Sequence, residues 1–330
     1  MFSATLPQGA RIVILGTGGT IAGTGHDPAR PWAYQAAQLG VGQLLASLLD
    51  GVPALRPWGA HLVAEQVAQV DSKDMGWPVW QALGAALQRH LADPSVLGVV
   101  ITHGTDTLEE TAALLHWLAP ATKPIVLTAA MRPATAVDAD GPSNLALSVA
   151  TVASAHRSGQ GGVVACLQGR VWSARDVRKA HSHALDAFDG GGVEPLRDAA
   201  PWPVGPALGW SWLQAPQPRV AMLTSHADAH WEAQALRQAL RARAQGELAL
   251  DGVLVACTGH GTVHEALDAA LQEAAAAGVV IWRSSRVAQG GVVPRDGDRW
   301  PAAGHWTAAQ ARLALQLHLM GVPAAALIAA

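Results

Sequence analysis

Two segments of the chain join an apolar run to a loop of glycine and threonine. The first is IVILGTGGTIAG (residues 12–23), and the second is LGVVITHGTDT (residues 97–107). Each is typical of a buried β-strand that ends in a loop of small hydroxyl residues. Ligands of open α/β proteins bind at the carboxyl ends of parallel strands. Two hydroxyl-bearing loops at one sheet edge suit nucleophilic catalysis that needs neither a metal ion nor a nucleotide.

Around these loops, short apolar runs alternate with segments of helical periodicity. Further strands are expected at residues 125–129 and 163–167, and helices at residues 79–91 and 108–118. Strands that alternate with helices indicate a mostly parallel sheet covered by helices.

A proline-rich segment, residues 199–218, divides the chain. It carries little charge, and its prolines are typical of an interdomain linker. The alternation then restarts, with strands expected at residues 220–223, 252–256 and 279–282 and helices at residues 231–243, 263–277 and 308–320. We therefore expect a larger, mostly parallel α/β layer domain (residues 1–198) and a smaller C-terminal α/β domain (residues 219–330).

The composition excludes several classes of protein. A net charge of −3 offers no basic surface for nucleic acid. Residues 1–11 lack the pattern of a signal peptide, and no uncharged apolar stretch is long enough for a membrane span. We therefore expect a soluble, cytoplasmic protein that binds neither nucleic acid nor membranes. Cys166 and Cys257 lie in separate apolar runs, which predicts buried thiols rather than a disulfide framework.

Lysine is rare in this chain, which has three lysines against nineteen arginines. Lys179 therefore stands out within its charged segment. A partly desolvated lysine loses its proton readily and can act as a base, which arginine cannot do. Together with Thr105 and Asp106, it would supply a hydroxyl, a base and an orienting carboxylate. Thr107 and Glu110 have the spacing of a helix capping box, which leaves Thr105 and Asp106 free for chemistry.

The glycine-rich loop at residues 16–20 does not fit a nucleotide site. The third glycine of a dinucleotide fingerprint falls on Ile21, and no Gly-Lys-Ser/Thr follows. A threonine in such a loop can be a nucleophile if a base removes its proton. Three histidine pairs have ligand-like spacing but no companion cysteine or completing histidine, so we expect no metal and no cofactor. They are His181 and His183, His226 and His230, and His260 and His264.

Seven motifs, taken together, resemble those of the bacterial-type L-asparaginases and glutaminase-asparaginases. They follow the family's order through nearly the whole chain: TGGTIAG (17–23), DSKDM (71–75), ITHGTDT (101–107), AMRP (130–133), DGP (140–142), RDVRK (175–179) and RSSR (283–286).

The resemblance implies catalytic roles. Thr20 falls on the family's nucleophile, and Tyr34, the only tyrosine here, falls on the tyrosine of a mobile loop over the site. Thr105, Lys179 and Asp106 fall on the second catalytic triad. The implied reaction forms an aspartyl ester on Thr20, releases ammonia, and then releases aspartate to water.

It also implies substrate contacts. Ser72 falls on the residue that holds the α-carboxylate, and Asp106 should contact the α-ammonium. Ala130 falls on a backbone contact near the amide, and the backbone near Gly19 is a candidate oxyanion donor. Lys73 replaces a glutamine of many relatives near the α-ammonium, which it should repel unless an acid intervenes or it points away.

The family's subunits form a homotetramer built from dimers, with active sites between subunits. A neighbouring subunit supplies a carboxylate, for which Asp296 or Asp298 is the candidate here. L-Asparaginase activity is the leading hypothesis. A broad glutaminase-asparaginase, an amidase acting on glutaminyl-tRNA and a non-catalytic amino-acid sensor are the alternatives, and the balance between asparagine and glutamine is left open.

Overall fold

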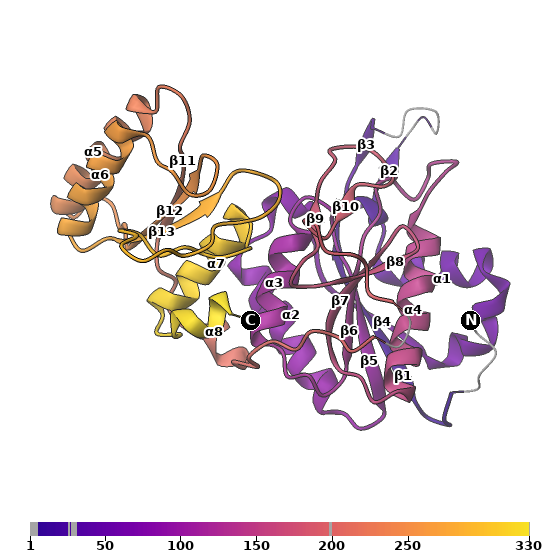
Figure 1. Ribbon diagram of the computed structural model, residues 1–330. Helices are drawn as coiled ribbons and strands as arrows, with labels where there is room; N and C mark the ends of the chain where they lie inside the picture. The colour runs from indigo at the N-terminus through magenta and orange to yellow at the C-terminus, as the bar shows by residue number, and fades with distance from the viewer. Residues whose placement is uncertain (1–5, 26, 28–31, 198–199, 330) are drawn as a thin grey trace. The chain divides into compact units, whose positions relative to one another are not determined.

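The computed structural model describes residues 6–25, 27, 32–197 and 200–329 (Figure 1). The chain forms two compact units, residues 1–214 and 215–330. Both are α/β layers, and the larger one contains a mostly parallel sheet. The predicted fold class is therefore confirmed.

The first unit is built on a six-stranded sheet. In spatial order its strands are β4 (Leu62–Val70), β1 (Arg11–Gly18), β5 (Val96–Thr102), β6 (Pro124–Thr128), β7 (Gly162–Leu167) and β8 (Arg170–Ser173). Neighbouring strands are parallel except β7 and β8, which are antiparallel. Since β1 and β5 are neighbours, their two threonine loops leave the sheet side by side.

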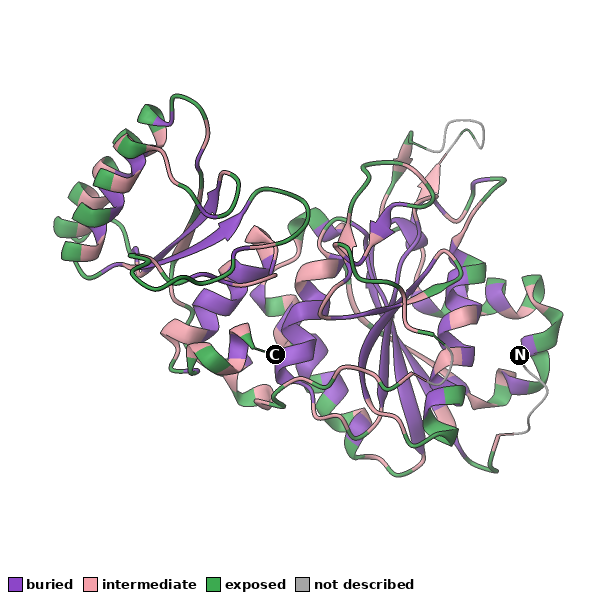
Figure 2. Ribbon diagram, viewed as in Figure 1, coloured by how far each residue is buried: buried purple, intermediate pink, exposed green. Residues whose placement is uncertain are grey.

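Helices cover both faces of this sheet, and the strands between them are buried (Figure 2). The helices α2 (Trp77–Ala92) and α3 (Leu108–Leu118) pack on one face, and α1 (Val41–Gly51) and α4 (Gly141–Arg157) pack on the other. Strand β1 feeds both cores, with Ile12 on the α1/α4 side and Val13 on the α2/α3 side. Burial on both faces explains why these strands are continuous apolar runs.

Short elements at the sheet edge and between the helices complete the first unit. They are η1 (Thr20–Ala22), β2 (Thr24–Gly25), β3 (Tyr34–Gln35), η2 (Pro53–His61), η3 (Ser72–Asp74), β9 (Arg178–Lys179), β10 (Phe188–Asp189) and η4 (Trp210–Gln214). Strand β2 pairs with β3, and β9 pairs with β10, both antiparallel.

The second unit has a parallel sheet of β11 (Val220–Thr224), β12 (Gly252–Cys257) and β13 (Val280–Ser285). Helices α5 (His230–Ala244) and α6 (Glu265–Ala276) form one core with it, and α7 (Ala308–Leu319) packs against β12. The last helix, α8 (Ala324–Ile328), packs on α7.

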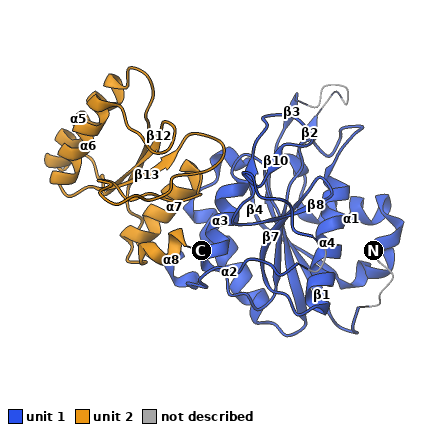
Figure 3. Cartoon of the chain, viewed as in Figure 1, with its two compact units in different colours: residues 1–214 blue, residues 215–330 orange. Residues whose placement is uncertain are grey.

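The boundary between the units, after residue 214, falls inside the segment predicted as a linker, residues 199–218 (Figure 3). Residues 200–214, expected as linker, pack on the first unit, whereas residues 198–199 lie outside the described part. Trp77 Nε1 and Gln81 Nε2 both donate to the Leu213 carbonyl, at 2.9 and 2.8 Å. Leu213 is buried against Gly84, where a Cβ would lie 2.4 Å from its Cδ1. The apolar side chains of this segment have a binding surface on α2, so its prolines do not make it a free linker.

Candidate active site

The two threonine loops meet through a pair of glycines. Gly18 and Gly19, with φ of 106° and 80°, turn the chain sharply at the end of β1. A Cβ on Gly19 would lie 2.3 Å from the Gly104 Cα, so the backbones of the two loops are in direct contact. Glycine at position 19 therefore allows the loop that carries Thr20 to lie directly against the loop that carries Thr105.

Thr20, the predicted nucleophile, is buried at the start of η1. Its Oγ1 lies 2.7 Å from the Oη of Tyr34, which β3 brings back over the loop by pairing with β2. A Cβ on Gly23 would lie 2.9 Å from the Tyr34 ring, so this glycine makes room for the tyrosine. The hydroxyl of Thr20 therefore has a second hydroxyl through which a proton can pass.

Thr105, Lys179 and Asp106 come together as the sequence predicts. Lys179 Nζ lies 3.0 Å from Thr105 Oγ1 and 2.6 Å from Asp106 Oδ1. Strand β9 carries the lysine, and its backbone N–H donates to Glu109 Oε2 at 2.8 Å. The Lys179 side chain is 17% exposed and that of Asp106 is 54% exposed, so the carboxylate faces the open side.

Ser72 is hydrogen-bonded to the second threonine loop. Its buried Oγ accepts the Asp106 N–H at 3.2 Å, and its carbonyl accepts the Thr107 Oγ1 proton at 2.8 Å. The predicted capping box is therefore wrong: Thr107 is the N-cap residue of α3, but its side chain bonds Ser72 instead of the helix. A tertiary carbonyl within reach outcompetes the local cap that the spacing favours.

Lys73 turns toward two acids of its own segment. Its Nζ lies 2.9 Å from Asp74 and 3.0 Å from Asp71, and its side chain is 62% exposed. Hydrogen bonds to Asp74 and then Asp71 raise the pKa of Lys73. It does not line the cavity described next, and unlike the buried Ser72 beside it, its side chain is exposed and paired with these two acids.

A cavity of about 660 Å³ opens between these loops. Its lining residues are Thr20, Trp32, Tyr34, Thr105, Asp106, Met131, Arg132, Lys179, Ser182 and His183. The predicted contacts Gly19, Ser72 and Ala130 are buried and are not among the lining residues. Sequence reasoning missed five of the lining residues. Met131 and Arg132 follow Ala130 in its motif, and Ser182 and His183 follow Lys179 closely, but no pattern marks Trp32.

His103 supports the second loop from inside the core. It is fully buried, its Nδ1 lies 2.7 Å from the Gly104 carbonyl, and its Nε2 lies 2.9 Å from Thr111 Oγ1. Thr111 Oγ1 in turn accepts the Trp80 Nε1 proton at 2.9 Å. Burial lowers the pKa of His103 to about 4, so the ring is neutral and donates from Nδ1.

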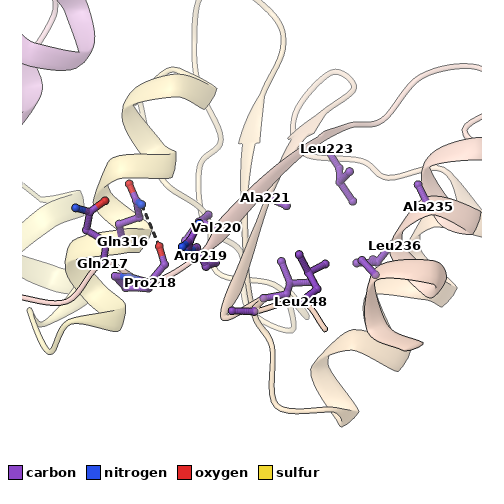
Figure 4. Close-up of a pocket in the computed structure, with 13 residues that line it drawn as sticks. Gln217, Pro218, Arg219, Val220, Ala221, Leu223, Ala235, Leu236, Leu248 and Gln316 are labelled. Carbon is purple, nitrogen blue, oxygen red and sulfur yellow. Dashed lines mark hydrogen bonds between the residues drawn. The ribbon is translucent and has the colours of Figure 1, made fainter. Parts of the chain in front are cut away.

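A second cavity, of about 540 Å³, lies within the second unit (Figure 4). Apolar side chains such as Leu223, Leu236 and Leu248 dominate its lining. Gln316 Nε2 donates to the Pro218 carbonyl there at 3.1 Å. The described residues that line it provide no hydroxyl, carboxylate, imidazole or amine side chain. The described lining of this cavity therefore offers neither a nucleophile nor a base.

The histidines and the C-terminal acids have local partners. His264 Nδ1 accepts the Ala266 N–H, and His226 pairs with Glu232 at 2.8 Å. No three His, Cys, Asp or Glu side chains are grouped for a metal ion within the described ranges. Asp298 is held by Arg283 and by the Arg295 N–H, whereas Asp296 is exposed.

Fold and site together define a class: a two-unit α/β protein with the site of a hydrolase, in which a buried threonine nucleophile candidate and a hydroxyl–lysine–carboxylate group lie at one sheet edge. Two family models match the chain, Asparaginase, N-terminal, over residues 11–202 and Glutaminase/Asparaginase C-terminal domain over residues 219–322. The chain belongs to the asparaginase family, which confirms the predicted resemblance.

Known proteins resemble the chain over most of its length. It is 36% identical to the glutaminase-asparaginase of Pseudomonas fluorescens biotype A, in an alignment covering 88% of this chain and 79% of the relative. It is 34% identical to the probable periplasmic L-asparaginase of Haemophilus influenzae, covering 96% and 90%. The crystal structure of the probable cytoplasmic L-asparaginase from Campylobacter jejuni matches with a TM-score of 0.81 and 32% identity, covering 95% and 96%.

Proposed function

We propose that the protein is an L-asparaginase, which hydrolyses the side-chain amide of L-asparagine to L-aspartate and ammonia. The observation that carries the proposal is one cavity that combines Thr20, hydrogen-bonded to Tyr34, with Thr105, hydrogen-bonded to Lys179. The names of the relatives, L-asparaginase and glutaminase-asparaginase, support the same reaction.

In the proposed mechanism, Thr20 Oγ1 attacks the amide carbon while its proton leaves through Tyr34. The C–N bond breaks, the nitrogen takes up a proton, and ammonia departs from an aspartyl ester on Thr20. Water then adds to the ester, its C–O bond breaks, and the proton returns to Thr20. Lys179 acts as the base of the second triad: its amine takes a proton through Thr105 as the new bond to the carbonyl carbon forms and gives it back as the C–N or C–O bond breaks, and Asp106 hydrogen-bonds to the ammonium group that exists in between.

The surroundings of the cavity support the substrate contacts that the family implies. Ser72 Oγ accepts the Asp106 N–H, and its own proton is donated to no described residue, which leaves it for an α-carboxylate. Asp106 is exposed enough to meet an α-ammonium. The Gly19 N–H donates to the Val70 carbonyl at 2.9 Å, so the backbone N–H groups of Thr20 and Thr105 are the candidate oxyanion donors. Lys73 takes no part, because Asp71 and Asp74 hold it.

The test is ammonia release by the purified protein from L-asparagine, L-glutamine and D-asparagine. We expect L-asparagine to give the highest kcat/KM. Acid-quenched samples taken during turnover, digested and weighed by mass spectrometry, should contain an aspartyl ester on the peptide with Thr20. Turnover of L-asparagine with no ester at Thr20, after rapid quenching under saturating substrate, would contradict the mechanism.

The alternatives give different results in the same assays. Comparable turnover of glutamine would make the protein a glutaminase-asparaginase, like the Pseudomonas relative by name. Calorimetric binding of asparagine without ammonia release would make it a sensor. Binding of labelled tRNA on filters would favour the tRNA amidase, which the net charge of −3 does not support.

We further propose a cytoplasmic homotetramer built from dimers that works without a cofactor, with Asp296 as the acid offered to a neighbouring subunit. Among the residues that the structure describes, no helix is both long and apolar enough to cross a bilayer. The Campylobacter protein is named cytoplasmic and the Haemophilus protein periplasmic. Light scattering of the purified protein tests the assembly, and cell fractionation tests the location.

A further inference from the structure

The connection from β6 to α4 is fastened by the first residue before the helix. Asp140, the N-cap of α4, accepts the Met131 N–H on Oδ2 at 3.0 Å and the Arg132 N–H on Oδ1 at 2.9 Å. Burial raises the pKa of Asp140, and these backbone donors act in the opposite direction. Both carboxylate oxygens are therefore engaged by the backbone of the loop that lines the cavity.

Asn144, one turn further along α4, is hydrogen-bonded to the same loop at Ala129. It is fully buried, and its Nδ2 donates to the Ala129 carbonyl at 3.0 Å and to Asp140 Oδ2 at 3.1 Å. Its Oδ1 accepts the Gln168 N–H at 2.9 Å. The side-chain amide thus uses both of its donors and its acceptor.

These bonds fix the orientation of Ala130, which lies between them. In a trans peptide the C=O and N–H point in opposite directions. Since the Ala129 C=O points at Asn144, the Ala130 N–H points away from α4. Since the Met131 N–H points at Asp140, the Ala130 C=O also points away from α4.

Ala130 itself is close to the proposed nucleophile. Its side chain packs with Ile21, the neighbour of Thr20, and Gly141 lets the two approach α4 closely, since a Cβ there would lie 3.0 Å from Ile21. Ala130 is buried, and its C=O and N–H bond to none of the described residues. A buried carbonyl without a partner is costly unless a ligand donates to it.

We propose that Asp140 and Asn144 are positioning residues for the amide group of the substrate: they hold the Ala130 carbonyl toward the cavity, where it accepts a hydrogen bond from the NH₂ that leaves as ammonia. This inference rests on the proposed function and deepens it. Asn144 is also connected to the segment that follows Lys179. Its Oδ1 accepts the Gln168 N–H, and Gln168 Nε2 donates to the Leu185 carbonyl in that segment. The buried side-chain amide of Asn144 therefore connects the loop of Ala130 with the segment that follows Lys179, through Gln168.

The test compares two leaving groups in one variant. In Asp140→Asn, an NH₂ replaces one acceptor oxygen, so either the Met131 or the Arg132 N–H loses its partner and the Ala130 carbonyl shifts. The β-methyl ester of L-aspartate forms the same acyl-enzyme but loses methanol, which leaves from an ester oxygen that carries no N–H for this carbonyl. We expect kcat/KM for L-asparagine to fall about tenfold or more, and that for the ester to change less than about threefold.

The matched control is Ser143→Ala in the same turn of α4. Ser143 is exposed and donates only to the Asp140 backbone carbonyl, so neither substrate should be affected. Equal losses for both substrates in a folded Asp140→Asn protein would overturn the inference, and so would an unchanged rate with asparagine. A wild-type protein inactive on both substrates would contradict the proposed function instead.

If Asp140→Asn does not fold, Asp140→Ser keeps one acceptor at the helix N-cap and takes its place. A crystal structure of Thr20→Val with L-asparagine, which retains Asp140 and Asn144, tests the contact directly. A distance above about 3.5 Å between the Ala130 oxygen and the substrate amide nitrogen would overturn the inference.

Discussion

The two sheets of this protein both end in hydroxyl residues at their carboxyl edges, but the hydroxyls have different partners. In the second unit, Ser284 Oγ donates to the Trp306 carbonyl at 2.7 Å, and Ser285 Oγ donates to the Gly259 carbonyl at 2.7 Å. In the first unit, Thr20 meets a tyrosine hydroxyl and Thr105 meets a lysine. A hydroxyl held by a backbone carbonyl is a structural tie, whereas one held by a titratable group can lose its proton.

Burial separates the two edges as well. Thr20 and Thr105 are buried, yet both reach the cavity. Ser284 is equally buried but reaches only the core. The motif RSSR therefore resembles the threonine loops in composition without sharing their chemistry. The following predictions test this difference, from the largest expected effect to the smallest.

Thr20→Ala should lower kcat with L-asparagine by at least about 10⁴-fold, because it removes the hydroxyl on which the proposed ester forms. Thr24→Ala removes a hydroxyl from the adjacent strand β2, does not touch the cavity lining, and should retain activity. Ammonia release measures both. Substantial activity in Thr20→Ala would remove the proposed distinction between the two edges.

Lys179→Met should lower kcat by about 10²–10⁴-fold, since it removes the base and keeps the length of the side chain. Lys123→Met is the matched control, because Lys123 Nζ donates to the Asp93 carbonyl and lies outside the cavity lining. Circular dichroism accompanies the kinetics. If Lys179→Met unfolds while Lys123→Met does not, Lys179 is a structural residue.

Acid should weaken the first unit through its buried histidines, and the two described ones, His103 and His116, should each contribute. The pKa of His103 is lowered to about 4 by burial, below its ordinary value near 6.5. Its contribution to stability is therefore present above pH 6.5 and is lost as the pH falls toward 4. From pH 7 to 4.5 we expect a loss of roughly 2–3 kcal/mol from His103 in the free energy of unfolding, measured by urea titration.

His103→Gln should reduce that pH dependence, since glutamine does not titrate. His226 of the second unit provides the contrast, because hydrogen bonds to the Ala227 carbonyl and to Glu232 raise its pKa. Its contribution is present at low pH and lost as the pH rises. An unchanged acid response in His103→Gln would show that other groups cause the loss.

Ser284→Ala should leave kcat within about threefold of wild type and lower the free energy of unfolding by about 1–2 kcal/mol, because the Trp306 carbonyl loses its donor. Kinetics and urea titration on one preparation check both values. A large loss of activity without a loss of stability would mean that the second edge also takes part in catalysis.

Most apolar strands could be predicted from sequence because they are buried on both faces. Strand β11 is only half-buried and was predicted from its apolar run alone. Strands β5, β6 and β7 lie within one residue of the apolar runs that predict them, whereas β1 continues three residues beyond its apolar run, to Gly18. Strand β4 could not be found this way, since most of its residues are half-buried and its sequence mixes polar with apolar positions. Helix α4 was not predicted, because its many alanines and serines weaken the contrast between an apolar and a polar face.

The residues of the candidate site were predicted from sequence motifs. Two other predictions, the capping box at Thr107 and the free linker, failed for physical reasons. The spacing of Thr107 and Glu110 describes one helix, but the carbonyl that binds Thr107 comes from Ser72, thirty-five positions away in the chain. The proline-rich segment has the composition of a linker, yet Leu213 binds the face of α2 that Gly84 leaves open. Local patterns carry no information about such distant partners.

The contact of Gly19 with Gly104 has a consequence for judging other sequences of this kind. A threonine nucleophile has a chemical substitute in serine, but a position where a Cβ would lie 2.3 Å from the opposing backbone has no substitute for glycine. In a chain that keeps both threonines and loses either glycine, the two loops could not approach this closely, and the threonine side chains would be displaced. Glycine at positions 19 and 104 is therefore a stricter criterion for an active member of the family than the threonine hydroxyls themselves.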